Sequence, residues 1–166
     1  YNCTALTSVE IGNNVTSIGE CAFQNCTALT DVVISDSVKA IGMYAFDGCT
    51  ALTNVVIGEG VTSIDERAFY NCTSLESIAM PYVGKHFGYM FGASYYDHND
   101  DYVPASLKTV IITSGDSIAD YAFYNCSSIE NITIPNSVTY VGKYAFYGCD
   151  ALQYTLKGDA WYLGNE

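Results

Sequence analysis

The sequence has few charged residues, very few basic ones and no long apolar run, and each shortage excludes a class of protein. Charged residues make up 14% of the chain and hydrophobic residues 49%, which is unlike an intrinsically disordered protein. Only 6 lysines and arginines stand against 18 acidic residues, so the net charge of −12 opposes binding to nucleic acid or to a bare anionic membrane. No apolar stretch approaches the roughly 18 residues needed for direct membrane insertion. The simplest role of the acidity is solubility.

Motifs of the common enzyme and metal sites are also absent. The sequence has no G-x-S-x-G, no H-E-x-x-H and no glycine-rich phosphate-binding loop. It has no C-x-x-C pair of the kind that binds zinc. We therefore expect a protein that is not an enzyme, with no catalytic residue and no cofactor.

What the sequence contains instead is a repeat of 23 residues. Phe23, Phe46 and Phe69 are 23 residues apart, and so are Phe123 and Phe146. Cysteine and leucine columns keep the same step, which gives the template A-F-x-x-C-x-x-L-x-x-V-x-I-x-x-x-V-x-x-I-G. One unit is too small to bury its own apolar side chains. Consecutive units must therefore stack into a solenoid with a continuous core.

Within each unit the apolar positions predict one short strand and a return by turns. Leu29, Val32 and Ile34 end in an alternating pattern, which is typical of a strand with one buried face. The wider spacing from Val38 to Ile41 and on to Phe46 suits irregular or 3₁₀ structure. No stretch keeps a helical apolar stripe for ten residues.

These columns resemble BspA-like leucine-rich repeats, a family of bacterial surface proteins. The resemblance covers nearly the whole chain and is carried by Ala22-Phe23, Cys26, Leu29, Ile34 and Ile41-Gly42, with their copies. It implies a leucine-rich-repeat solenoid, with parallel β-strands on the concave face and turns and short 3₁₀ segments on the convex face. It also implies an exported, cell-surface protein used in adhesion.

The chain begins at Tyr1, inside a repeat, so we expect residues 1–166 to be a single leucine-rich-repeat domain cut from a longer chain. The export signal would then lie elsewhere in the parent protein. Trp161, Tyr162 and Leu163 are expected to fold over the last unit as a partial cap. Nothing before Cys3 can do so, which predicts neighbouring repeats in the parent or end-to-end self-association of the fragment.

The repeat is interrupted in an irregular unit at 79–121, where about ten extra residues separate Phe91 from Leu107. The inserted loop carries Tyr95, Tyr96 and Tyr102, which we interpret as a contact loop, although a solvated excursion is the alternative. Its acidic run at 97–101 could bind calcium or be a plain acidic loop. His86 falls in the column of Ile41, unless Phe87 fills that space.

Six of the seven cysteines share one repeat position and are expected to be buried, reduced thiols, because stacked rungs hold them slightly too far apart for disulfides. Cys21 lies in another column and is expected to be a free surface thiol. Two further columns carry tyrosines that could bind sugars or a partner, or simply shield the Phe column. The first contains Tyr44, Tyr121 and Tyr144, and the second Tyr70, Tyr124 and Tyr147.

The outward positions of the strands predict where a ligand would bind. One row contains Asp31 and Asn54, and the row beside it Val33, Val56, Ala79, Ile111 and Thr133. The second row is unusually apolar for a solvated surface, as in a protein-binding site, although β-branched residues also favour strands for their own sake. We therefore predict a binding or adhesion module that recognises a host or bacterial surface protein or a glycan through the concave sheet and the Tyr-rich loop. The alternative is a structural spacer that presents other domains of a surface protein.

Overall fold

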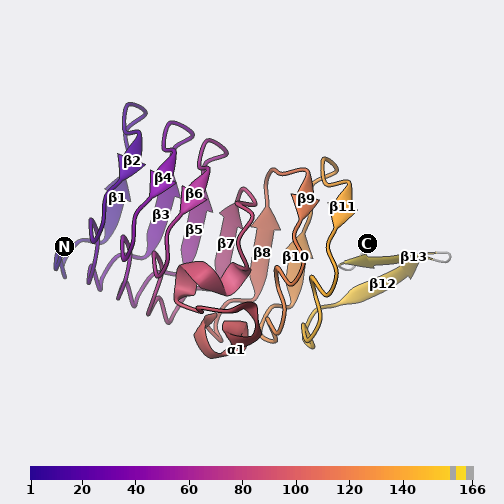
Figure 1. Ribbon diagram of the computed structural model, residues 1–166. Helices are drawn as coiled ribbons and strands as arrows, with labels where there is room; N and C mark the ends of the chain where they lie inside the picture. The colour runs from indigo at the N-terminus through magenta and orange to yellow at the C-terminus, as the bar shows by residue number, and fades with distance from the viewer. Residues whose placement is uncertain (158–159, 164–166) are drawn as a thin grey trace.

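The computed structural model describes residues 1–157 and 160–163, with side chains up to residue 153, and shows a solenoid of stacked rungs (Figure 1). One side of the solenoid is a six-stranded parallel sheet in the order β1-β3-β5-β7-β8-β10. Its strands are β1 Ser8–Glu10, β3 Asp31–Ile34, β5 Asn54–Ile57, β7 Ser77–Met80, β8 Thr109–Ile112 and β10 Asn131–Thr133. The predicted leucine-rich-repeat solenoid is confirmed.

The register of this sheet follows the 23-residue step. Val33 pairs with Val56, and across the irregular unit Ala79 pairs with Ile111. Strands β3 and β5 both alternate between exposed and buried positions, so Val32 and Ile34 point into the core. The two outward rows expected from the sequence are therefore continuous across the sheet.

A second ladder of short strands, which the sequence pattern did not predict, runs beside the first. Strands β2 Ser17–Ile18, β4 Ala40–Ile41 and β6 Ser63–Ile64 form one parallel sheet, and β9 Ser117–Ile118 pairs with β11 Tyr140–Val141 in another. These segments are two residues long, too short for any periodicity to show. They pair because stacked rungs place their backbone N–H and C=O groups opposite partners. The irregular unit lies between these two small sheets, β2-β4-β6 and β9-β11 (Figure 1).

The third side consists of tight turns that carry the Ala-Phe pairs. The backbone N–H of Phe23 donates to the carbonyl of Ala45 at 2.7 Å, and that of Phe46 to Ala68 at 2.8 Å. Two residues of each turn have positive φ, and one of them is the residue before the cysteine. Asn25 has φ 57° there and Gly48 φ 70°, a conformation that Asn and Gly adopt more readily than other residues.

A column of stacked phenylalanine rings, the Phe spine, runs through the core behind these turns. The ring of Phe46 lies 5.2 Å from that of Phe23 and 5.2 Å from that of Phe69. In the irregular unit Met90 and Phe91 occupy the positions of the Ala-Phe pair, because the backbone N–H of Phe69 donates to the carbonyl of Met90. The contact with Phe123, at 4.9 Å, is made instead by Phe87. His86 and Phe87 are the two candidates for the column of Ile41. His86 is half-buried, and Phe87 packs in the Phe spine instead.

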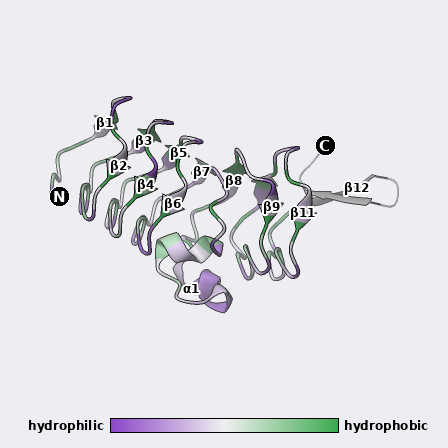
Figure 2. Ribbon diagram, turned by 45° about the horizontal axis from the view of Figure 1, so that its top comes forward, coloured by the Kyte–Doolittle hydropathy of each residue, from purple (hydrophilic) through white to green (hydrophobic). Residues whose placement is uncertain are grey.

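Three short helices occupy the middle of the irregular unit: η1 Phe87–Phe91, η2 Tyr96–His98 and α1 Asn99–Tyr102. Within η1 the rings of Phe87 and Phe91 meet edge to face at 5.4 Å, so Phe91 contacts the ring that packs on Phe123. Figure 2 shows that α1 is hydrophilic, while η1 is more apolar and lies against the rungs. Both lie on the turn side of the solenoid (Figures 1 and 2).

The last described strands, β12 Tyr154–Lys157 and β13 Ala160–Leu163, pair antiparallel and form a separate two-stranded sheet. The expected capping by Trp161, Tyr162 and Leu163 concerns side chains outside the described part of the chain. No helix in that described part is long and apolar enough to cross a membrane.

Candidate functional site

The outward face of the six-stranded sheet, here called the sheet face, carries an exposed apolar strip. We define the apolar strip as Val33, Val56, Ala79 and Ile111, one residue from each of four neighbouring strands. Val33 is 61% exposed, Val56 45% and Ile111 39%, although the residues on either side of each along the strand are buried. Thr133 on β10 continues the row with an exposed polar side chain.

A shallow surface hollow of about 570 Å³ lies over the first strands of this face, which sequence alone could not show. Glu10, Val33 and Val56 border it, together with Ser35 and Asp36. Apolar side chains that line a hollow and have polar groups at its edge match the composition of protein-binding surfaces.

The polar row beside the strip is held together by hydrogen bonds between strands. The amide of Asn54 donates to the carboxylate of Asp31 at 2.9 Å, and the hydroxyl of Ser77 donates to the amide oxygen of Asn54 at 2.7 Å. The bond from Asn54, with a second from Thr30, lowers the pKa of Asp31 from its ordinary value. This row therefore presents a fixed negative charge next to the apolar strip.

The inserted loop is attached to the solenoid by Asn99, which is fully buried. Its side-chain oxygen accepts a hydrogen bond from the backbone N–H of Gly88 at 3.0 Å, and its amide donates to the carbonyl of Tyr124 at 2.7 Å. His86 lies 3.1 Å from the same oxygen. Burial lowers the pKa of His86, and the contact with Asn99 opposes that shift. Sequence reasoning missed Asn99 because nothing distinguishes it within a polar run.

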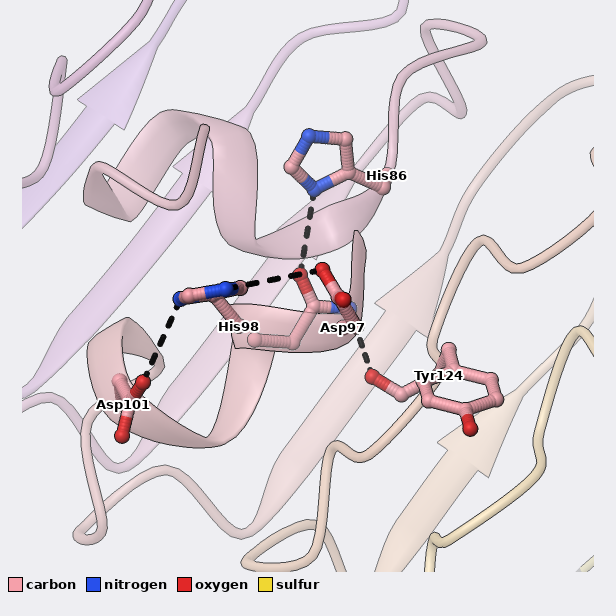
Figure 3. Close-up of polar contacts among 6 residues, drawn as sticks. His86, Asp97, His98, Asp101 and Tyr124 are labelled. Atoms are coloured by element: carbon pink, nitrogen blue, oxygen red, sulfur yellow. Dashed lines mark hydrogen bonds and ion pairs between the residues drawn. The ribbon is translucent and has the colours of Figure 1, made fainter. Parts of the chain in front are cut away.

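Two of the aspartates of the loop, Asp97 and Asp101, lie close to a histidine side chain. His98 lies between Asp97 and Asp101, at 3.8 and 3.6 Å (Figure 3). Among the described residues, no three His, Cys, Asp or Glu side chains gather closely enough to hold a metal ion.

The three loop tyrosines proposed as contacts do not form one group. Tyr96 stacks on Tyr121 with ring centroids 4.2 Å apart, whereas Tyr102 packs against Tyr70 at 6.4 Å. Tyr95 is 69% exposed and lies near His98. Two of the three therefore extend the tyrosine columns of the flanking rungs. Tyr102 lies in α1, which is on the turn side of the solenoid (Figure 2), and the ring partners of Tyr96 and Tyr102 are tyrosines of the turns, so the structure does not bring these two together with the apolar strip.

The cysteine column forms a stack of thiols without disulfides among the described residues. The thiol of Cys49 donates to the carbonyl of Phe23 at 3.2 Å, and that of Cys72 to Phe46 at 3.3 Å. Burial raises the pKa of Cys49 to about 12 and that of Cys72 well above its usual value, so both thiols stay protonated. The expectation that all six column thiols are buried is wrong for Cys3, which is exposed because no rung precedes its turn in this sequence. Cys21 is a free thiol as expected, but it is half-buried rather than on the surface.

Solved structures of bacterial leucine-rich-repeat proteins resemble this fold. A leucine-rich repeat protein from Bacteroides ovatus is 26% identical with a TM-score of 0.59, over 90% of this chain and 36% of its own. One from Eubacterium ventriosum is 29% identical with a TM-score of 0.50, over 98% of this chain and 37% of its own. The T. pallidum leucine-rich repeat protein is 23% identical with a TM-score of 0.51, and the aligned part covers 87% of this chain and 77% of the T. pallidum chain. At this identity the similarity supports the fold alone.

The chain spans little more than a third of the first of these relatives. No curated protein matches the sequence. The family described as the BspA type leucine-rich repeat region matches residues 1–95 and 101–165 in six copies, and the gap falls inside the inserted loop. The chain therefore belongs to the BspA-type leucine-rich-repeat family.

Proposed function

We propose that the chain is a non-enzymatic binding module of an exported, cell-surface protein, and that it recognises another protein through the sheet face. The observation that carries this proposal is the apolar strip, whose three β-branched members, Val33, Val56 and Ile111, stay exposed on β3, β5 and β8. Strand formation alone does not explain the apolar residues, because Glu10 and Thr133 are polar and occupy outward positions of the same row. Membership of the BspA-type family supports the surface location.

The rigidity of the sheet favours binding over a passive role. The strip residues sit on paired strands, so their positions are fixed before a partner arrives, and little ordering free energy is lost on association. Asp31 and its hydrogen-bonded neighbours add a charged border, which gives direction to an otherwise apolar contact.

The test is a pull-down with the folded fragment on a panel of immobilised extracellular-matrix proteins. In one variant Val33, Val56 and Ile111 are all replaced by Ser. In the matched control Val15→Ser is combined with Val141→Ser, since those valines are 37% and 48% exposed and lie outside the strip. We expect specific binding that is lost in the strip variant and kept in the control, with unchanged circular dichroism in both.

The alternative function is a structural spacer that presents other domains of the parent protein. The uniform stacking of the regular rungs favours it, because a uniform solenoid is a suitable stalk. Absence of binding to the whole panel, or equal binding by the wild type and the strip variant, would support the spacer and contradict the use of the strip.

A further inference from the structure

Five tyrosines on the turn side enclose a second surface hollow, of about 390 Å³. We call it the tyrosine trough and define it by its lining residues, Tyr96, Tyr121, Tyr124, Tyr144 and Tyr147. Tyr96 comes from the inserted loop and the other four from two consecutive turns. Its volume lies within the range of roughly 300–1,000 Å³ typical of small-ligand sites.

The rings form two rows whose planes are steeply inclined to each other. In one row Tyr121 lies between Tyr96 and Tyr144, with centroids 4.2 and 5.5 Å away. In the other Tyr124 stacks on Tyr147 at 5.0 Å. The interplanar angle between the rows is 79° at Tyr96 and Tyr124, 55° at Tyr121 and Tyr124, and 85° at Tyr144 and Tyr147. The planes of the two rows are therefore inclined to each other around the hollow.

The backbone holds these rings in place before any ligand arrives. Tyr121 and Tyr144 have φ of 58° and 57°, an uncommon conformation for a bulky residue, and it is repeated at this position in every regular turn. Asn99 fixes the loop against the carbonyl of Tyr124, and so positions Tyr96 in the same surface. A set of rigid tyrosines loses little conformational entropy on binding.

The hydrogen-bonding groups of the trough are free for a ligand. The hydroxyls of Tyr44 and Tyr82 have protein partners elsewhere, at 3.0 and 3.1 Å. Within the described part of the chain, the five trough hydroxyls have none. Each tyrosine hydroxyl can donate one hydrogen bond and accept others, so the trough combines apolar ring surface with several unpartnered polar groups.

The charges around the trough restrict what it can bind. The five residues that line it are all tyrosines, so no charged side chain lines it. Burial is the main cause of the raised pKa of Tyr124, and the nearby tyrosines and the carboxylate of Asp97 raise it further. Because the whole chain carries a net charge of −12, an anionic ligand is disfavoured. A cation cage is also disfavoured, because Tyr144 already holds the ammonium of Lys143 at 4.9 Å.

We propose that the tyrosine trough is a binding site for a neutral carbohydrate. The C–H face of a sugar ring would pack on the tyrosine rings while its hydroxyls exchange hydrogen bonds with the phenols. The trough lies on the turn side and not on the sheet face, so this proposal does not depend on the proposed protein-binding function. A proline-rich peptide is the competing occupant, because such segments also dock on aromatic grooves. The five unpartnered hydroxyls favour a ligand rich in hydroxyl groups.

The test uses the folded fragment on an array of neutral oligosaccharides and of the same oligosaccharides carrying sialic acid or sulfate. The affinity of the best neutral oligosaccharide is then measured by calorimetry for Tyr147→Ala, Tyr147→Phe and the matched control Tyr140→Ala. Tyr147 and Tyr140 are 58% and 59% exposed, so neither substitution threatens the fold, and Tyr140 lies on β11 outside the trough.

We expect neutral glycans to be preferred and Tyr147→Ala to weaken binding about tenfold, as at a typical hot spot. Tyr147→Phe keeps the ring and should weaken binding about threefold, through the lost hydroxyl. Tyr140→Ala should bind like the wild type. The strip variant of the sheet face should also keep full carbohydrate binding, which separates this proposal from the proposed function.

Several results would overturn the proposal. They are absence of binding to neutral glycans, preference for the acidic forms, or equal affinity of Tyr147→Ala and the wild type. A proline-rich peptide that binds the trough in place of glycans and is insensitive to Tyr147→Phe would assign the trough to the competing occupant.

Discussion

The rings of Phe46 and Phe69 lie 5.2 Å apart and only 2° from parallel, and both are fully buried. Each ring of the regular spine is stabilised by its neighbours in the adjacent rungs, so the spine links units that make no covalent cross-link. Loss of an interior ring leaves a cavity that two rungs share, and the surrounding turns cannot collapse into it because their backbone bonds to the next rungs fix them.

We therefore expect Phe46→Ala to lower the free energy of unfolding by about 3–5 kcal/mol, the usual cost of removing a buried phenyl ring. Chemical denaturation followed by circular dichroism measures the change. Phe146→Ala is the matched control, because Phe146 belongs to the same column but is only partly buried. A loss of less than about 1 kcal/mol in Phe46→Ala would contradict a structural role for the spine.

Asn99 gives a second prediction, on the attachment of the inserted loop. Asn99→Ala removes the partners of the Gly88 N–H and the Tyr124 carbonyl, and each unsatisfied buried group costs about 1–3 kcal/mol. We expect faster hydrogen exchange at Gly88 and early proteolytic cleavage within 92–106, while the six-stranded sheet stays protected. Asp100→Ala, at an exposed neighbouring position, is the control and should leave both measurements unchanged.

Asp31 gives a prediction on pH. Its folded-state pKa is lowered, first by the bond from Asn54 and then by that from Thr30, so the charged carboxylate favours the folded state. The stabilisation is present above the ordinary pKa of 3.8 and is lost as the pH falls through the lower, folded-state pKa. NMR titration should place the midpoint of Asp31 below 3.8, and Asn54→Ala should move it upward.

The control for this titration is Asn131→Ala, in the same outward row but on β10, at the other end of the sheet. It should leave the midpoint of Asp31 unchanged. If Asn54→Ala does not move the midpoint, the side-chain bond between β3 and β5 is not formed in solution.

The regular part of the fold follows directly from the sequence. A strand whose side chains alternate, repeated every 23 residues, leaves only one register that keeps Val32 and Ile34 buried, and the sheet has that register. The outward positions of Asp31, Val33 and Val56 follow from the same alternation.

The irregular unit could not be predicted to the same depth, because its structure depends on contacts between residues that no periodicity relates. Phe87 enters the spine through the geometry of η1, and Asn99 is buried because it meets two backbone groups of other segments. The tyrosine trough has the same origin. Tyr121 and Tyr144 are visible as a column in the sequence, but only the folded loop brings Tyr96 beside them.

The cysteines allow a prediction that tests the stacking of the turns by chemistry. Only a thiolate reacts readily with an alkylating reagent, and burial holds the pKa of Cys49 at about 12 and that of Cys149 at about 11. At pH 8 the thiolate fraction of a group with pKa 12 is about one in ten thousand, and the reagent must also reach it. Iodoacetamide should therefore modify the exposed Cys3 and the half-buried Cys21 in the folded protein, and spare the column from Cys26 onward.

Mass spectrometry of the alkylated fragment counts the modified thiols, and Cys21→Ser should reduce the number by one. All 7 cysteines should react in denaturant, which controls for any disulfide or prior oxidation. Raising the pH from 8 to 9 should leave Cys72 unmodified, because it is fully buried and its pKa is well above the usual value. Modification of Cys72 at the rate of Cys21 in the folded protein would show that the turns open far more often than their hydrogen bonds to neighbouring rungs imply.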